Sequence, residues 1–360
     1  MSGGARPVMI LAGGTGGHVF PAIAVAERLR DQGVPVVWLG TEQGLEARVV
    51  PQAGIPIEWL TVRGLRQKGL AGWLRAPGML LRATAQALRI LRKHRPRAVL
   101  GMGGYVSGPG ALAARLLGVP LLIHEQNAVA GFTNRKLKPL AKRVMTGFDG
   151  VFGEGAKITH TGNPVRGAIG QLPPPEQRVP RNGRLHLLVL GGSQGAQALN
   201  ENVPAALALI EPALRPQVLH QAGPKHLQEA QAAYQAAGID AEVVPFIEDM
   251  AAAYQWADLA VCRAGALTLA ELAAAGVPSV LVPFPFAVDD HQTANARHLV
   301  ARDAAVLFPQ DQLNPERLAG TLAELLADRT HLLTMAANAR SLGRPDAAAR
   351  VAQLCLEAAK

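Results

Sequence analysis

Two segments of the 360-residue chain share a pattern that few folds accommodate: a short apolar run, a glycine-rich turn and a helical pattern. In the first segment, residues 8–11 lead into the turn 12–18, AGGTGGH. In the second, residues 185–190 lead into the turn 191–196, GGSQGA. A strand that enters a helix through a glycine turn opens each half of a Rossmann-like fold. The chain is therefore expected to contain two such units.

Further apolar runs follow each turn, and most are separated by helical segments rich in alanine and leucine. Strands that alternate with helices form parallel sheets with helices on both faces. The sequence therefore predicts an α/β protein with two Rossmann-like doubly wound domains facing across a cleft. The other predicted strands are residues 34–39, 98–100, 120–124, 143–146, 217–220, 241–245, 259–262, 279–283 and 304–307.

A segment rich in proline is the expected linker between the two domains. Residues 171–184 contain several prolines and an Asn-Gly pair, and they lack an apolar period. We place an N-terminal domain at residues 1–165 and a C-terminal domain at residues 166–343. The last helical pattern, residues 344–360, is expected to pack back on the first domain.

The positive charge of the chain is concentrated in one stretch. The formal net charge is +9, yet the eleven Lys and Arg residues between Trp59 and His124 have no Asp or Glu among them. Such a stretch suggests a nucleic-acid-binding protein, but few aromatic residues accompany it for base stacking. With 49% hydrophobic and 18% charged residues, the composition excludes a disordered or fibrous chain.

Several common signals are absent from the sequence. Cys262 and Cys355 are the two cysteines, and their spacing fits no metal or redox motif, which indicates a reducing compartment. The first apolar run is too short for a signal peptide, and no stretch reaches the ~18 apolar residues of a membrane span. There is neither a GxxxxGKS/T phosphate loop nor an Asp-x-Asp metal pair.

The first glycine turn departs from the dinucleotide-binding motif G-x-G-x-x-G, because Val19 occupies the sixth position counted from Gly14. Several glycines at one turn allow a ligand to approach the backbone amides, and a tight turn packed on the sheet is the alternative. His18 begins the following helix, where the helix dipole disfavours imidazolium. A neutral imidazole suits a general base, and a histidine that only caps the turn is equally compatible.

Two more segments of the first domain follow predicted strands. One is the glycine cluster 101–110, and the other is His124-Glu125-Gln126-Asn127. Ligands bind at the carboxyl ends of parallel strands in this architecture. Since several such loops emerge from strand ends, a binding site is favoured over an ordinary surface loop.

The second domain offers groups that suit a nucleotide. The turn 191–196 is expected to present amides and the Ser193 hydroxyl at a helix N-terminus, which favours a diphosphate. Arg166 could add a positive charge or be an ordinary surface arginine. The spacing of Thr268 and Glu271 favours a capping box, and a carboxylate that binds a ribose is the alternative.

Taken in order along the whole chain, these motifs closely resemble one family, the bacterial peptidoglycan N-acetylglucosaminyltransferases called MurG. The resemblance implies a GT-B fold. It also implies transfer of N-acetylglucosamine from UDP-GlcNAc to the muramyl-pentapeptide on undecaprenyl diphosphate, which converts lipid I to lipid II. The motifs that carry the resemblance are residues 13–21, 101–110, 124–127, 162–166, 191–196, 262–271 and the helical pattern that contains Gln292.

By motif match, the resemblance places UDP-GlcNAc on the second domain. Arg166 and Ser193 would contact the diphosphate, and Ile247 would lie against uracil. Glu271 would bind the ribose, and Gln292 would read the sugar hydroxyls. The other substrate-binding residues that the resemblance implies are Thr15, Gly16, Gly17 and Asn127 in the first domain and Ala266, Leu267, Thr268, Leu269 and Ala270 in the second.

The resemblance further implies a single in-line displacement that inverts the anomeric carbon. His18 is the first candidate for the base that activates the acceptor 4-hydroxyl, and Glu125 is the second. In the absence of an Asp-x-Asp pair, Arg166 and helix amides are expected to balance the charge of departing UDP. We therefore expect no metal site and no obligatory cofactor.

The basic stretch then acquires a role, because the implied acceptor is anchored in an anionic bilayer. Interleaved basic and apolar side chains bind such surfaces, and an amphipathic helix packed on its own domain is the alternative. We predict a peripheral protein at the cytoplasmic face of the bacterial inner membrane, without a nucleic-acid partner. The predicted membrane contacts are Trp73, Leu74, Arg75, Met79, Leu80 and Arg82.

Two other enzymes fit parts of the sequence. A UDP-GlcNAc 2-epimerase on the same fold would bind the same nucleotide but would leave the basic stretch without a function. An NAD-dependent oxidoreductase is supported by Glu42, near the end of the second predicted strand, and disfavoured by Val19 in the glycine motif.

Overall fold

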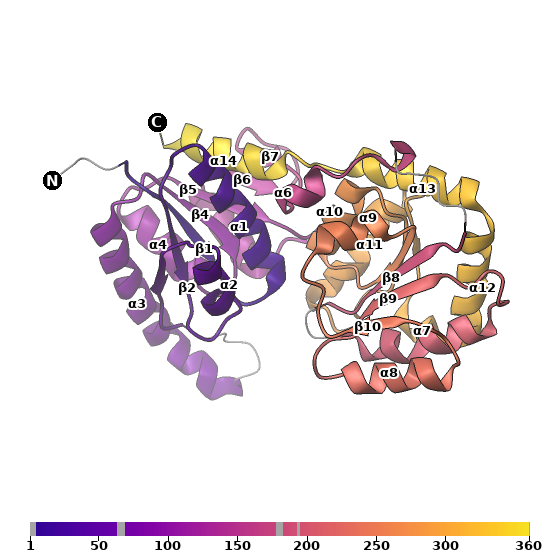
Figure 1. Ribbon diagram of the computed structural model, residues 1–360. Helices are drawn as coiled ribbons and strands as arrows, with labels where there is room; N and C mark the ends of the chain where they lie inside the picture. The colour runs from indigo at the N-terminus through magenta and orange to yellow at the C-terminus, as the bar shows by residue number, and fades with distance from the viewer. Residues whose placement is uncertain (1–4, 63–68, 178–182, 193–194, 360) are drawn as a thin grey trace. The chain divides into compact units, whose positions relative to one another are not determined.

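The chain divides into two compact units in the computed structural model (Figure 1). Unit 1 comprises Met1–Arg166 and Asp346–Lys360, and unit 2 comprises Gly167–Pro345. These boundaries lie one and two residues after the expected ones, so Arg166 belongs to unit 1. The structure describes residues 5–62, 69–177, 183–192 and 195–359, and of residues 69–76 and 288 it describes the backbone alone.

Unit 1 is built on a parallel sheet with the strand order β3-β2-β1-β4-β5-β6-β7 among the described residues. Every residue of the central strands β1 (Val8–Ala12), β4 (Ala98–Gly103) and β5 (Leu121–Glu125) is buried. Strands covered on both faces are apolar almost throughout, which explains why the sequence revealed them. The other strands are β2 (Val36–Gly40), β3 (Ile57–Trp59), β6 (Arg143–Thr146) and β7 (Ile158–His160).

Helices cover both faces of this sheet. One core joins the sheet to α1 and α14, with Val351 and Leu354 of α14 among its buried residues, and Figure 1 shows α14 beside α1. A second core joins the opposite face to α3 and α4. The helices of unit 1 are α1 (Gly16–Asp31), α2 (Glu46–Gln52), α3 (Gly69–His94), α4 (Ser107–Leu116), α5 (Phe132–Leu137), η1 (Lys138–Leu140) and α14 (Ala347–Ala358).

Unit 2 repeats the architecture with the strand order β10-β9-β8-β11-β12-β13, again parallel throughout its described pairings. The two predicted doubly wound α/β domains are thereby confirmed. Its strands are β8 (His186–Leu190), β9 (Gln217–Gln221), β10 (Glu242–Val244), β11 (Leu259–Cys262), β12 (Ser279–Leu281) and β13 (Ala305–Leu307). Its helices are α6 (Gly167–Gly170), η2 (Pro175–Gln177), α7 (Gln197–Leu209), α8 (Leu227–Ala236), α9 (Met250–Trp256), α10 (Ala266–Ala275), η3 (Val288–Asp290), α11 (His291–Val300), η4 (Gln310–Gln312), α12 (Pro315–Ala327) and α13 (Arg329–Leu342).

The proline-rich segment is not the linker that the sequence suggested. Its described part lies within unit 2, where Leu172 and Pro175 are buried. The Arg340 guanidinium donates a hydrogen bond to the Leu172 carbonyl oxygen at 3.1 Å. The proline content and the lack of an apolar period suggested an exposed linker, but residues of this segment bury apolar surface within unit 2.

Candidate functional site

The carboxyl ends of β1, β4 and β5 lie next to one another in unit 1, and each continues into one of the loops that the sequence singled out. The β1 and β4 loops pack backbone against backbone, because a Cβ at Gly104 would collide with the Gly13 carbonyl oxygen. Gly104 also has a φ of +83°, which favours glycine. The glycines are thus needed for the close approach of two loops.

Helix α1 begins at Gly16, two residues before the start expected from the sequence, so His18 lies in its first turn. The amides of His18 and Val19 donate to the Thr15 carbonyl oxygen at 3.1 and 3.2 Å. Thr15 is the N-cap residue, without a hydrogen bond from its side chain to the helix. The N-terminus of α1 at the sheet edge is therefore formed by Thr15, Gly16, Gly17 and His18.

The His18 imidazole contacts both neighbouring loops. Its Nδ1 lies 3.2 Å from Oε1 of Gln126, in the loop after β5. A Cβ at Gly103, the last residue of β4, would collide with the ring. The ring is thus held between two loops at the sheet edge.

Glu125 is buried and holds the β5 loop together. Its Oε1 accepts from the backbone and side-chain nitrogens of Asn127 at 3.0 and 3.3 Å. Its Oε2 accepts from the Gly131 amide and the Asn134 side chain, both at 2.9 Å. With four donors on its two oxygens, the carboxylate orients Asn127.

Glu46 is a residue that the sequence analysis missed. It is fully buried in the first turn of α2, and its Oε2 accepts from the Gly14 amide at 2.9 Å. Its Oε1 accepts from the Thr41 amide and hydroxyl at 2.9 and 2.7 Å. The carboxylate therefore joins the first glycine turn to Thr41, which follows β2. Its position after a strand and among glycines at 40 and 44 was the available signal.

His124 and Asn163 attach the β5 loop to the segment that leaves unit 1. The His124 Nε2 hydrogen donates to the Gly162 carbonyl oxygen at 3.0 Å, and the Asn163 side chain donates to the Gln126 carbonyl oxygen at 2.9 Å. Complete burial penalises the charged imidazolium and lowers the pKa of His124 to about 4. His124 is therefore neutral near pH 7.

In unit 2, the second glycine turn is braced by Gln221, at the end of the neighbouring strand β9. The Gln221 Nε2 donates to the Gly192 carbonyl oxygen at 3.0 Å, and its Oε1 accepts from the Ile247 amide at 2.9 Å. One side chain thus joins the expected diphosphate turn to the residue expected against uracil. The prediction for Ser193 lies outside the described residues.

The predicted capping box at the start of α10 is wrong. Gly265 is the N-cap, so Thr268 is the third residue of the helix, and no side chain caps it. Glu271 is instead buried, and its Oε2 accepts from the Tyr254 hydroxyl at 3.1 Å. The residues Ala266, Leu267, Thr268, Leu269, Ala270 and Glu271 form the first turns of this helix, after β11.

Two further predicted residues have described partners of their own. Gln292, in the first turn of α11, accepts from the Phe284 amide through Oε1 at 2.9 Å and so anchors the loop before the helix. Arg166 stacks its guanidinium 4.8 Å from the ring centre of Phe20 on α1. Arg263, given no role from the sequence, donates to the Val282 and Pro283 carbonyl oxygens at 3.2 and 3.3 Å.

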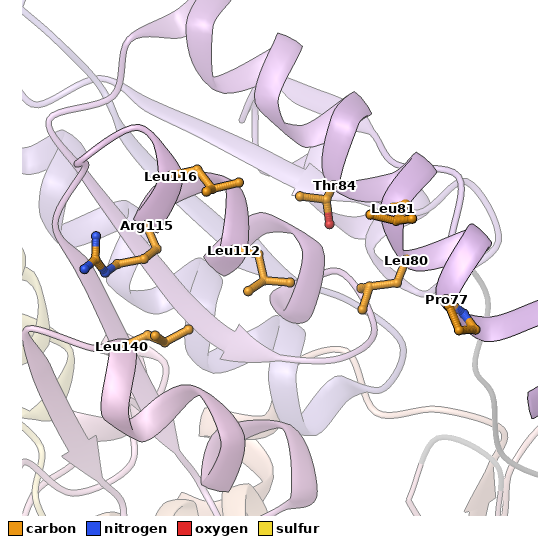
Figure 2. A pocket seen from close by; sticks show the side chains of 8 residues that line it. All are labelled: Pro77, Leu80, Leu81, Thr84, Leu112, Arg115, Leu116 and Leu140. Carbon is orange, nitrogen blue, oxygen red and sulfur yellow. The ribbon is translucent and has the colours of Figure 1, made fainter.

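An apolar groove of about 500 Å³ lies on unit 1 between α3 and α4 (Figure 2). Leu81 and Leu116 are 73% and 69% exposed at its walls, and Arg115 is an exposed cation at its edge. Contiguous exposed apolar side chains are less common on protein surfaces than single ones. The groove is lined by Pro77, Leu80, Leu81, Thr84, Leu112, Arg115, Leu116 and Leu140.

The predicted membrane contacts fall partly on this groove. Leu80 lines it, Arg82 is exposed on the same helix, and Met79 is half-buried. The side chains of Trp73, Leu74 and Arg75 lie outside the described residues. No helix in the described ranges has the length and apolar character to cross a membrane. The described residues also contain no cluster of three or more His, Cys, Asp or Glu that could hold a metal.

Comparison with known proteins covers nearly the whole chain. Residues 8–146 match the glycosyltransferase family 28 N-terminal domain, and residues 186–351 match its C-terminal domain. Proteins from Alkalilimnicola ehrlichii and Nitrosococcus oceani are 65% and 60% identical, each over 98% of this chain and 99% and 98% of their own. Both are named UDP-N-acetylglucosamine–N-acetylmuramyl-(pentapeptide) pyrophosphoryl-undecaprenol N-acetylglucosamine transferase.

Solved structures agree with these matches. The crystal structure of MurG from Acinetobacter baumannii is 44% identical and superimposes with a TM-score of 0.84, over 98% of this chain and 99% of that one. A glycosyltransferase of kitacinnamycin, 18% identical with a TM-score of 0.72 over 99% of this chain and 100% of its own, shares the fold. The predicted GT-B fold is confirmed, and the chain belongs to the MurG family of glycosyltransferases.

Proposed function

We propose that this protein transfers N-acetylglucosamine from UDP-GlcNAc to the 4-hydroxyl of undecaprenyl-diphosphate-linked N-acetylmuramyl-pentapeptide, with inversion at the anomeric carbon. The observation that carries the proposal is the 65% identity over 98% of the chain to a relative named for this transfer. The second candidate, a UDP-GlcNAc 2-epimerase, has no such support among the relatives described above.

His18 is the general base of the proposed reaction. It lies at the carboxyl edge of the unit 1 sheet, and its ring is oriented by Gln126. Glu125 is the weaker candidate, because both of its oxygens are already engaged by hydrogen-bond donors of its own loop. We assign Glu125 to the orientation of Asn127 instead.

Unit 2 binds the nucleotide in this proposal. The glycine turn before α7 presents a helix N-terminus, which stabilises the negative charge of a diphosphate. Ile247, Glu271 and Gln292 lie in loops or helix starts after the strands β10, β11 and β12. Arg166, the last residue of the first segment of unit 1, is assigned the positive charge that the departing UDP requires.

The reaction is proposed to need no divalent cation. Arg166 and the helix amides then take the place that a metal has in other transferases. Activity should persist in EDTA at the rate measured without it. A loss in EDTA that Mg²⁺ restores would contradict this part of the proposal.

The groove on unit 1 faces the lipid in this proposal, at the cytoplasmic face of the inner membrane. Exposed leucines insert among lipid headgroups, and basic residues near an anionic surface add about 1 kcal/mol each. The double variant Arg82→Glu, Arg115→Glu should bind vesicles with anionic lipid at least about tenfold more weakly. The exposed Arg302→Glu of unit 2 is the matched control, and UDP binding should be unchanged in both. Equal vesicle binding by all three proteins would exclude this surface.

A radiolabel assay tests the transfer itself. Purified protein is incubated with labelled UDP-GlcNAc and a short-chain lipid-linked muramyl-pentapeptide, and label in the lipid product is measured. Reactions without acceptor and without enzyme serve as controls. Label that stays in UDP-linked sugar with an altered configuration would instead identify the epimerase.

A further inference from the structure

The orientation of the Gln126 side-chain amide is fixed by a backbone carbonyl. Gln126 is 2% exposed, and its Nε2 lies 2.8 Å from the carbonyl oxygen of Met102 on β4. A carbonyl oxygen cannot donate a hydrogen bond, so the atom that faces it must be the amide nitrogen. The other amide atom, Oε1, therefore points at His18, and the usual ambiguity between the two ends of a glutamine amide is removed.

This orientation determines which nitrogen of His18 carries the proton. Oε1 is an acceptor only, and it lies 3.2 Å from His18 Nδ1. The contact is a hydrogen bond only if Nδ1 bears hydrogen. A neutral His18 then carries its lone pair on Nε2, which is the nitrogen that can take a proton from a substrate hydroxyl.

The surroundings hold both partners in place. The Gln126 backbone is tied by Asn163, and Gly103 leaves room for the imidazole ring where any side chain would collide with it. The titratable residues that precede Gln126 on β5 are engaged elsewhere, His124 with Gly162 and Glu125 with its own loop. The amide of Gln126 is therefore held where it favours hydrogen on Nδ1 of His18.

We infer that Gln126 is a positioning residue that keeps the Nδ1–H tautomer of His18 and so prepares Nε2 as the base. The inference rests on the proposed function for its catalytic consequence. Its structural part, the tautomer, can be measured without any substrate.

The first test is an NMR measurement on the free protein labelled with ¹⁵N-histidine. The His18 signals are assigned by their loss in His18→Ala. The wild type should show hydrogen on Nδ1 and an unprotonated Nε2 in neutral rings. A proton on Nε2 instead would overturn the inference.

The second test compares two variants. Gln126→Met removes the acceptor and should give mixed tautomers, with kcat reduced by about 10- to 100-fold and KM for UDP-GlcNAc within about twofold. Gln126→Glu loses the donor to the Met102 carbonyl but keeps an acceptor toward Nδ1. It should therefore favour the Nδ1–H tautomer, and retain activity, more than Gln126→Met does. The wild-type spectrum decides the tautomer even if Gln126→Met fails to fold.

The outcomes separate this inference from the proposed function. If wild-type protein transfers sugar but Gln126→Met does so at the wild-type kcat, the role of Gln126 is overturned and the transfer stands. If the wild type performs no transfer, the proposed function fails, and the NMR result still decides the tautomer.

Discussion

The two glycine turns are alike in sequence but are braced by different chemical groups. Behind the turn of unit 1, a buried carboxylate, Glu46, accepts from the Gly14 amide. Behind the turn of unit 2, a neutral amide, Gln221, donates to the Gly192 carbonyl oxygen. Glu46 accepts a hydrogen bond from a backbone N–H and brings a negative charge to the turn of unit 1. Gln221 donates a hydrogen bond to a backbone carbonyl and brings no charge to the turn of unit 2.

This difference bears on what each turn can bind. A carboxylate held behind a glycine turn opposes a phosphate at the same place, because the like charges repel through a medium of low dielectric. A neutral brace leaves the attraction of a helix N-terminus for a diphosphate intact. The turn of unit 1 is therefore suited to position His18, and the turn of unit 2 to bind an anion.

Replacement of the base should have the largest effect and should separate the two units. His18→Ala should lower kcat by about 10²- to 10⁴-fold while UDP-GlcNAc binding by unit 2 persists. Steady-state kinetics and a UDP binding titration measure the two quantities. His160→Ala, an exposed histidine of the same unit, is the control. An unchanged kcat would remove His18 from the reaction.

Removal of the charged brace should come next in size. Glu46→Ala leaves three donors of Gly14 and Thr41 without their partner, so the free energy of unfolding should fall by about 3 kcal/mol. Urea denaturation measures this, and Glu46→Gln should recover part of the loss. The exposed Glu42→Ala is the matched control. Equal stability of the Glu46→Ala and Glu42→Ala variants would refute the bracing role.

Removal of the neutral Gln221 side chain should weaken nucleotide binding rather than stability. Gln221→Leu removes one of the two donors to the Gly192 carbonyl, which keeps the Gly195 amide, and leaves the Ile247 amide without its acceptor. The affinity for UDP should therefore fall about tenfold. Gln217→Leu, an exposed residue at the other end of β9, should bind as the wild type does. Calorimetric titration with UDP makes the comparison. A change confined to kcat would contradict the assignment of this turn to the donor.

The sequence revealed what depends on local pattern and missed what depends on partners distant in the chain. Buried strands such as β1 and β8 were predictable because their apolar runs are continuous. The edge strands β3 and β7 were missed because they are short, half-buried or exposed, and contain no two apolar residues in a row. The bond of Glu46 to Gly14 spans 32 residues, and no local period encodes it.

The same limit explains the wrong capping box. Thr268 and Glu271 have the spacing of that motif, but the Glu271 carboxylate accepts a hydrogen bond from Tyr254 on α9 instead. The glycine turns themselves, and His18 within the first, were visible because strand, glycine and helix follow one another directly in the sequence. The roles of Gln126 and Gln221 required the neighbouring strands to be placed side by side.

Each unit also contains a buried histidine with a lowered pKa, and its replacement should have the smallest effect. Burial lowers the pKa of His124 in unit 1 to about 4 and that of His220 in unit 2 to about 3, from 6.5. The unfolded chain therefore binds more protons than the folded one below pH 6.5, so stability is full above that pH and is lost as the pH falls. Between pH 6.5 and 5.5, each histidine should lower the free energy of unfolding by about 1 kcal/mol.

Urea denaturation at several pH values tests this. The free energy of unfolding of His220→Gln should decline less over this interval than that of the control His298→Gln, a change at an exposed residue of the same unit. Identical declines would mean that His220 is protonated as readily in the folded chain as in the unfolded one.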